Sequence, residues 1–190
     1  MEGQAVHPQA SSEEHDGAKC QLSSFSINHQ EEGDRCLPEE FGSASVPPRC
    51  VLLLLQFEAL QPEGICPGWS IVVKGETSSS SSMFEINLLC EPGDQIALHF
   101  NPRFSSSRIV CNSFLNSLWG QEEVNNTFPF KAKEPFQVEI YSDQDYFHVF
   151  INENKVLQYK HRQKNLSSIT KLQILNDVDI SSVEITKRGL

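Results

Sequence analysis

The stretch from His99 to Glu123, which reads HFNPRFSSSRIVCNSFLNSLWGQEE, decides which fold the chain can adopt. The residues that lead into it alternate with the two-residue period of a β-strand. The two predicted faces are Ile96, Leu98 and Phe100 on one side and Ala97, His99 and Asn101 on the other. Pro102 brings no backbone N–H to a sheet, so we expect the strand to end there. A second strand is predicted from Ile109 to Phe114.

The polar side chains of this stretch carry the hydrogen-bonding groups that a sugar needs. An imidazole, a carboxamide, a guanidinium and a carboxylate come from His99, Asn101, Arg103 and Glu122. Trp119 offers a flat, rigid surface for the apolar C–H face of a pyranose ring. Taken singly, a strand histidine is more often an ordinary surface residue, and a tryptophan more often belongs to a core. The hypothesis of a sugar site therefore depends on the whole set and its order.

The order H-x-N-P-R, then V-x-N, then W-G-x-E resembles the signature of the galectin family. Seven positions carry it here, namely His99, Asn101, Arg103, Val110, Asn112, Trp119 and Glu122. The resemblance implies a jelly-roll sandwich of two antiparallel sheets that binds β-galactoside glycans such as lactose. It implies that the galactose axial hydroxyl is held by His99, Asn101 and Arg103. Trp119 would stack on the ring, while Asn112 and Glu122 would take the exocyclic hydroxyl, with Glu122 also orienting Arg103.

Further segments extend the resemblance over roughly Leu54 to Leu190 and are most similar to a lens branch of the family, the galectin-related inter-fibre proteins. They are LQFEAL at 55–60, PGWSIVVKG at 67–75, MFEIN at 83–87, FHVF at 147–150, YKHR at 159–162 and ITKRGL at 185–190. One position departs from the family pattern, which usually reads W-G-x-E-x-R, because Val124 stands where the arginine is expected. We expect Glu122 to lose its usual partner, at a cost of about 1.5–3 kcal/mol. Galactoside binding is therefore expected to be retained but weakened.

Composition excludes several other functions. The formal net charge of −10 argues against a nucleic-acid partner, because phosphates would be repelled. The longest aliphatic run, Val51 to Leu55, is too short to cross a bilayer, and no signal peptide is evident, so we expect a cytoplasmic chain without membrane insertion. The six cysteines are then free thiols by default, with Cys90 and Cys111 as small core residues. No spacing of cysteine and histidine predicts a metal site, and no cofactor is expected.

The chain divides near residue 50 into a predicted disordered extension, residues 1–50, and a carbohydrate-recognition domain, residues 51–190. The extension is rich in Ser, Glu, Gln and Gly and cannot bury enough apolar area to offset its ordering entropy. The domain reads as many short strands with turn signals between them, which predicts an all-β sandwich. Within it, we expect Glu76 to Ser82, with its five serines, to be a hairpin tip and Thr127–Phe130 to be a strand. The segment Asn152-Glu153-Asn154 is predicted as a hairpin turn.

Three functions remain in view. The first is a galactoside-binding lectin, and the second is a non-lectin, crystallin-like structural protein of lens fibre cells, which Val124 favours. The third is an enzyme, which we discount because Glu122 and Glu123 are adjacent on a strand and point to opposite faces. Homodimer formation through the terminal strands, near Phe57 and near residues 183–185, is expected from the family resemblance and from the pairing capacity of sheet edges.

Overall fold

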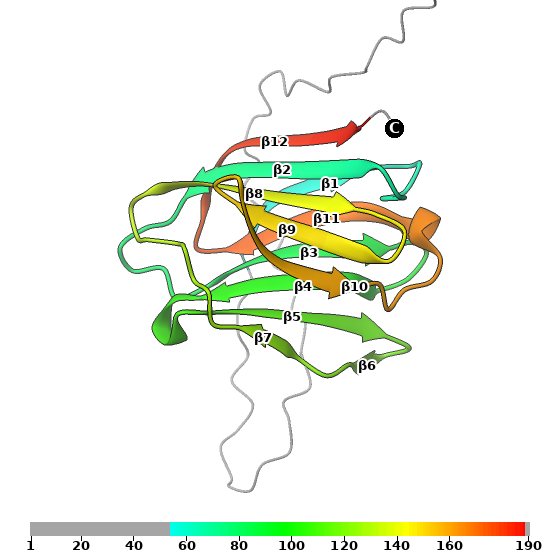
Figure 1. The fold of residues 1–190 in the computed structure, drawn as a ribbon, viewed down its shortest axis with the longest axis horizontal. Coiled ribbons are helices and arrows are strands. Elements are labelled where there is room, and N and C mark those ends of the chain that lie inside the picture. The colour runs from blue at the N-terminus through cyan, green and yellow to red at the C-terminus, as the bar shows by residue number, and fades with distance from the viewer. Residues whose placement is uncertain (1–53, 189–190) are drawn as a thin grey trace, which may run out of the picture.

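The computed structural model describes residues 54–188, which form two antiparallel β-sheets packed face to face (Figure 1). The first sheet follows the order β1-β11-β3-β4-β5-β6, with β7 also paired to β5. Its strands are β1 (Leu55–Leu60), β11 (Ile169–Asn176), β3 (Phe84–Cys90), β4 (Gln95–Arg103), β5 (Arg108–Leu115), β6 (Leu118–Trp119) and β7 (Glu123–Asn125). The second sheet, in order, contains β10 (Asn154–Lys160), β9 (Tyr146–Ile151), β8 (Pro135–Ser142), β2 (Trp69–Glu76) and β12 (Asp179–Lys187). The prediction of an all-β sandwich of jelly-roll type is confirmed.

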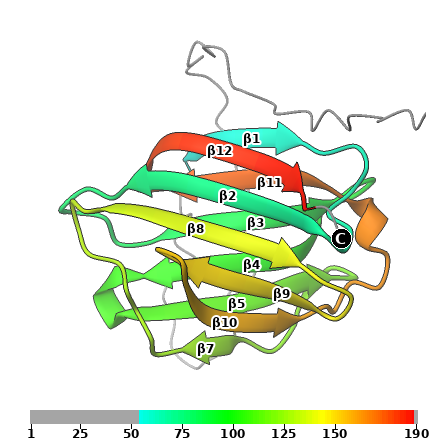
Figure 2. The same cartoon turned by 45° about the horizontal axis from the view of Figure 1, so that its top comes forward.

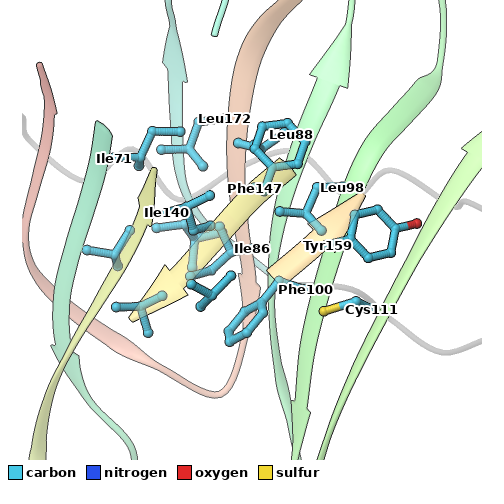
Figure 3. Packing of buried hydrophobic residues seen from close by; sticks show 14 of the residues in the cluster. Ile71, Ile86, Leu88, Leu98, Phe100, Cys111, Ile140, Phe147, Tyr159 and Leu172 are labelled. Atoms are coloured by element: carbon cyan, nitrogen blue, oxygen red, sulfur yellow. The ribbon is translucent and has the colours of Figure 1, made fainter. Parts of the chain in front are cut away.

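The core lies between the two sheets, where the inward-facing residues of one sheet meet those of the other (Figure 3). Ile71 and Ile140 of the second sheet face Leu88 and Leu98 of the first, and all four side chains are fully buried. Cys111 belongs to the same cluster, as does Cys90, which confirms that these two cysteines are core residues. The outer face of the first sheet is thereby left free to carry polar side chains without disturbing the core.

The strand that contains His99 does not end at Pro102, contrary to the sequence prediction, because β4 continues to Arg103. Pairing with β3 runs to Phe100 opposite Ile86, so Phe84 lies opposite Pro102 by continuation of that register. The carbonyl oxygen of Phe84 accepts a hydrogen bond from Nδ2 of Asn101 at 2.9 Å. The missing N–H of the proline is thus compensated by the side chain of the preceding residue.

The predicted faces of β4 are also wrong at one point. Ala97 joins the core cluster together with Leu98, whereas Ile96 does not. The reason is a shift in the pairing register between Ile96 and His99, which puts an extra residue into the strand. From Leu98 onward the predicted alternation holds, so His99 lies on the outer face.

Two further predictions are corrected by the strand order. Residues 76–82 do not form a hairpin tip, because β2 and β3 belong to different sheets and the serine-rich segment crosses between them. Thr127–Phe130 is not a strand. Pro129 interrupts any ladder there, and Phe128 and Phe130 instead pack on other aromatic rings at centroid distances between 5.1 and 6.2 Å.

The predicted hairpin turn between β9 and β10 is confirmed, with Asn152 and Glu153 both at positive φ. The terminal strands β1 and β12 are the outer strands of the two sheets and lie at the same side of the molecule (Figure 2). The predicted extension of residues 1–50 lies outside the described residues. Within residues 54–188 no helix has the length and apolar character that a membrane crossing requires.

Candidate functional site

The predicted site residues lie on the outer face of the first sheet, in rows that cross neighbouring strands. His99 on β4 lies opposite Asn112 on β5. Two residues further along β4, Asn101 lies opposite Val110. Directly opposed residues of antiparallel strands share a face. The row through His99 continues on its other side to Asn87 of β3. The structure therefore brings together on one surface side chains that the sequence spreads over two separate strands.

Two residues of the H-x-N-P-R motif, Asn101 and Arg103, are joined by a hydrogen bond. Nε of Arg103 donates to Oδ1 of Asn101 at 2.7 Å, and the Asn101 amide donates in turn to the backbone of β3. Nη2 of Arg103 donates to Oε1 of Glu122 at 3.0 Å, with both side chains about two-fifths exposed. The guanidinium of Arg103 is thus held by Asn101 and by Glu122, in agreement with the expectation that Glu122 orients it. Its remaining N–H groups can reach a ligand.

Trp119 closes one end of this surface. It lies on the short strand β6 opposite Phe114 of β5, and their rings are 5.3 Å apart. Its ring also meets the imidazole of His99 edge to face, at a centroid distance of 5.1 Å and an interplanar angle of 64°. The indole is only partly buried. A sugar ring placed on Trp119 would therefore have the polar residues of β4 beside it.

His99 is held by a polar contact that the sequence analysis did not predict. Its Nδ1 lies 2.7 Å from Oδ1 of Asn87, and Nδ2 of Asn87 donates to the buried carboxylate of Glu85. Burial, together with the positive charge of Arg103, lowers the pKa of His99 to about 4. The imidazole is consequently neutral at physiological pH and can accept as well as donate a hydrogen bond.

Asn112 and the Trp119 loop are clamped by a residue far along the chain, Arg162. Its Nη1 donates to Oδ1 of Asn112 at 3.0 Å, and its Nη2 donates to the carbonyl of Gln121 at 2.7 Å and to Oε1 of Glu123 at 2.8 Å. The guanidinium also lies over the Tyr159 ring, 4.8 Å from its centre. The YKHR segment marked this arginine in the sequence, but only the fold shows what it contacts.

Gly120 makes this clamp possible. A Cβ at that position would lie 2.4 Å from Nη1 of Arg162, so no larger residue fits without displacing the guanidinium. The carbonyl of Gly120 also accepts a hydrogen bond from Nδ2 of Asn112 at 2.9 Å. Both polar atoms of the Asn112 carboxamide are therefore fixed by the loop and by Arg162.

Val124 lies on β7 opposite Val110, in the same row as Asn101. Its side chain is 49 % exposed, so no core packing requires an apolar residue there. The charge that the family pattern provides at this position is missing from the site surface. Glu122 is nevertheless paired, because Arg103 binds it.

The two adjacent carboxylates of this region are engaged by different guanidinium groups. Glu122 binds Arg103, while Glu123 binds Arg162 from the neighbouring position. This arrangement fits a surface that holds a neutral polar ligand. Among the residues that the structure describes, no group of three or more His, Cys, Asp or Glu side chains could hold a metal ion.

The chain matches the family model for galactoside-binding lectins over residues 56–185. It is 46% identical to grifin of Rattus norvegicus over 138 residues, which covers 73% of this chain and 95% of that protein. It is 42% identical to grifin of Homo sapiens over the same length. Among solved structures, chicken galectin 2 superposes with a TM-score of 0.63 at 30% identity, covering 69% of this chain and 98% of that one.

The chain therefore belongs to the galactoside-binding lectins, the galectin family. Proteins of this class recognise carbohydrate and are not enzymes, which confirms the prediction against catalysis. Its similarity to grifins from three mammals confirms the resemblance drawn from the short segments of the sequence.

Proposed function

We propose that this chain is a lectin for β-galactoside glycans such as lactose, with an affinity reduced by Val124. The observation that supports it most is the arrangement on one sheet face of His99, Asn101 and Arg103 beside the partly exposed ring of Trp119. A galactoside offers both features that such a surface complements, an apolar ring face and directed hydroxyl groups.

The contacts support distinct roles for these residues. His99, Asn101 and Arg103 hold the axial hydroxyl, with Arg103 kept in place by Glu122. Asn112 takes the exocyclic hydroxyl together with Glu122. Val110 lies between Asn101 and Val124 in the strand register and supplies the apolar floor of the site.

The proposed lectin unit is residues 51–190, preceded by residues 1–50 as an extension. We expect it to act in the cytoplasm, with a lens setting expected from the sequence segments quoted above. The alternative is a structural protein in which the sugar site is a relic. Val124 favours this alternative, since one charged contact to the ligand is absent and its exposed side chain serves no core.

Homodimer formation through β1 and β12 is part of this proposal. Both are outer strands, and no strand within residues 54–188 pairs with their free side. β1 also exposes Leu55 and Leu60, which are 55 % and 61 % exposed. Pairing of two copies along these strands would cover both the backbone groups and the apolar side chains.

The test is a calorimetric titration of lactose into the full chain, with sucrose as the control sugar. We expect saturable binding of lactose but not of sucrose, and we expect lactose binding to be lost in Trp119→Ala. Tyr141→Ala is a matched control, because Tyr141 is a half-buried aromatic residue of the other sheet. Absence of heat up to about 50 mM lactose would reject the lectin proposal, since the binding free energy would then be weaker than about 2 kcal/mol. Unchanged binding by Trp119→Ala would reject the site.

A further inference from the structure

A chain of buried polar contacts leads into the candidate site from the far edge of the sheet. At its start, Leu54 and Asn176 are bound to each other, since N–H of Asn176 donates to the Leu54 carbonyl at 2.7 Å and N–H of Leu54 donates to Oδ1 of Asn176 at 3.4 Å. Nδ2 of Asn176 then donates to Oε1 of Glu85 at 3.2 Å. Nδ2 of Asn87 donates to Oε2 of Glu85 at 3.3 Å, and Oδ1 of Asn87 lies 2.7 Å from Nδ1 of His99.

The direction of every hydrogen bond in this series of contacts is fixed by its donors and acceptors. A backbone N–H can only donate, so the Asn176 carboxamide must turn its oxygen to Leu54 and its NH₂ to Glu85. An ionised carboxylate can only accept, so Asn87 must likewise turn its NH₂ to Glu85. The oxygen of Asn87 then faces His99, and Nδ1 of the imidazole has to carry the hydrogen.

Glu85 is a buried carboxylate whose two oxygens each accept a hydrogen bond from an amide. Its side chain is 9% exposed, and burial raises its pKa. The hydrogen bond from Asn87, the charge of Arg103 and the hydrogen bond from Asn176 act in the opposite direction and offset part of this rise in the pKa. With two amide donors on its two oxygens, the charged form leaves neither oxygen unsatisfied.

We propose that Glu85 is a positioning residue that sets the tautomer of His99 through Asn87, so that Nε2 presents a lone pair to the ligand. Nε2 has no hydrogen-bond partner among residues 54–188, and it is not one of the buried side-chain atoms that lack one, so a ligand can reach it. The site then requires a ligand group that donates a hydrogen bond to His99. A free hydroxyl does this, whereas an ether oxygen or a carboxylate at the same place does not.

A purely structural role for these side chains would be to hold neighbouring strands together. The structural role and the proposed positioning role differ in one measurable property, which is the ring nitrogen of His99 that bears the proton. A structural role is indifferent to that choice, whereas the proposal requires hydrogen on Nδ1 and none on Nε2.

The experiment is to record the ¹⁵N chemical shifts of the histidine side chains of the full chain at neutral pH, with His99 assigned by comparison with His99→Gln. We expect a protonated Nδ1 and an unprotonated Nε2. In Glu85→Gln the new amide can donate or accept, so Asn87 is free to turn over and His99 should populate both tautomers. Glu58→Gln is the matched control, because Glu58 lies on β1 of the same sheet and contacts Gln173 and Lys171 instead of Asn87.

Lactose affinity supplies a second measurement, and it rests on the proposed function. We expect Glu85→Gln to weaken lactose binding about three- to tenfold, with Glu58→Gln unchanged. A protonated Nε2 in the wild-type chain would overturn the proposal, as would an unaltered tautomer in folded Glu85→Gln. If the variant fails to fold, the wild-type spectrum still decides. If lactose does not bind at all but the tautomer is as expected, the proposed function fails and this inference stands.

Discussion

Val124→Arg should strengthen lactose binding, and the structure sets the size of the effect. Position 124 lies on the site face with its side chain 49 % exposed, so a longer residue fits without moving the core. Glu122 uses only Oε1 to bind Arg103, which leaves Oε2 for a second guanidinium. A charge-assisted hydrogen bond is worth about 1.5–3 kcal/mol. Because Glu122 is 44% exposed, solvent screening reduces this to about 0.5–1.5 kcal/mol, or about two- to tenfold in affinity.

The assay is a calorimetric titration of lactose and of a methyl β-galactoside into the full chain and the variant. By family resemblance the missing arginine reaches the second sugar, so the gain should appear with lactose and be small with the single galactose ring. Leu118→Arg is the control for added charge, because Leu118 is exposed on the neighbouring strand β6. A folded Val124→Arg chain with unchanged lactose affinity would refute the argument that this position limits binding. An equal gain from Leu118→Arg would assign the effect to net charge instead.

Four more outcomes are expected. Arg162→Lys should weaken lactose binding about five- to thirtyfold with little change in melting temperature, because an ammonium cannot hold three oxygens in a planar fork; affinity equal to wild type would contradict the clamp on the Trp119 loop. Lactose affinity should stay constant from about pH 8 to about pH 6, since burial and Arg103 lower the pKa of His99 to about 4. As pH falls from 6.5 to about 4 the unfolded chain takes up this proton first, so the free energy of unfolding should fall, and denaturant titrations of His99→Gln should lack that part of the decline. Light scattering of the concentrated full chain should give twice the 21.4 kDa monomer mass, and Leu60→Glu should restore the monomer; a monomeric wild-type chain would speak against pairing through β1.

The sequence could predict the fold class, and it could predict that the candidate site residues of β4 share one sheet face, because both depend on local patterns. His99, Asn101 and Arg103 are two residues apart on one strand, so the strand period alone places them on one face. Hairpin turns likewise have local signals, as at Asn152 and Glu153. Irregularities in the ladder have no such signal. The register shift beside Ile96 and the continuation of β4 through the proline both depend on the partner strand.

The parts of the site that escaped prediction are those whose contacts join distant segments. Asn176 binds Glu85 across 91 positions, and Arg162 binds Asn112 across 50. No periodicity links such pairs, and they meet only because β11 lies beside β3 and because the chain after β10 returns to the edge of β5 and β6. The motif thus names the candidate groups on the sheet face, while strand order selects the groups that orient them. A substitution that repairs the motif at Val124 can add a contact, but the hydrogen-bonding state of His99 depends on Glu85, which lies outside the motif.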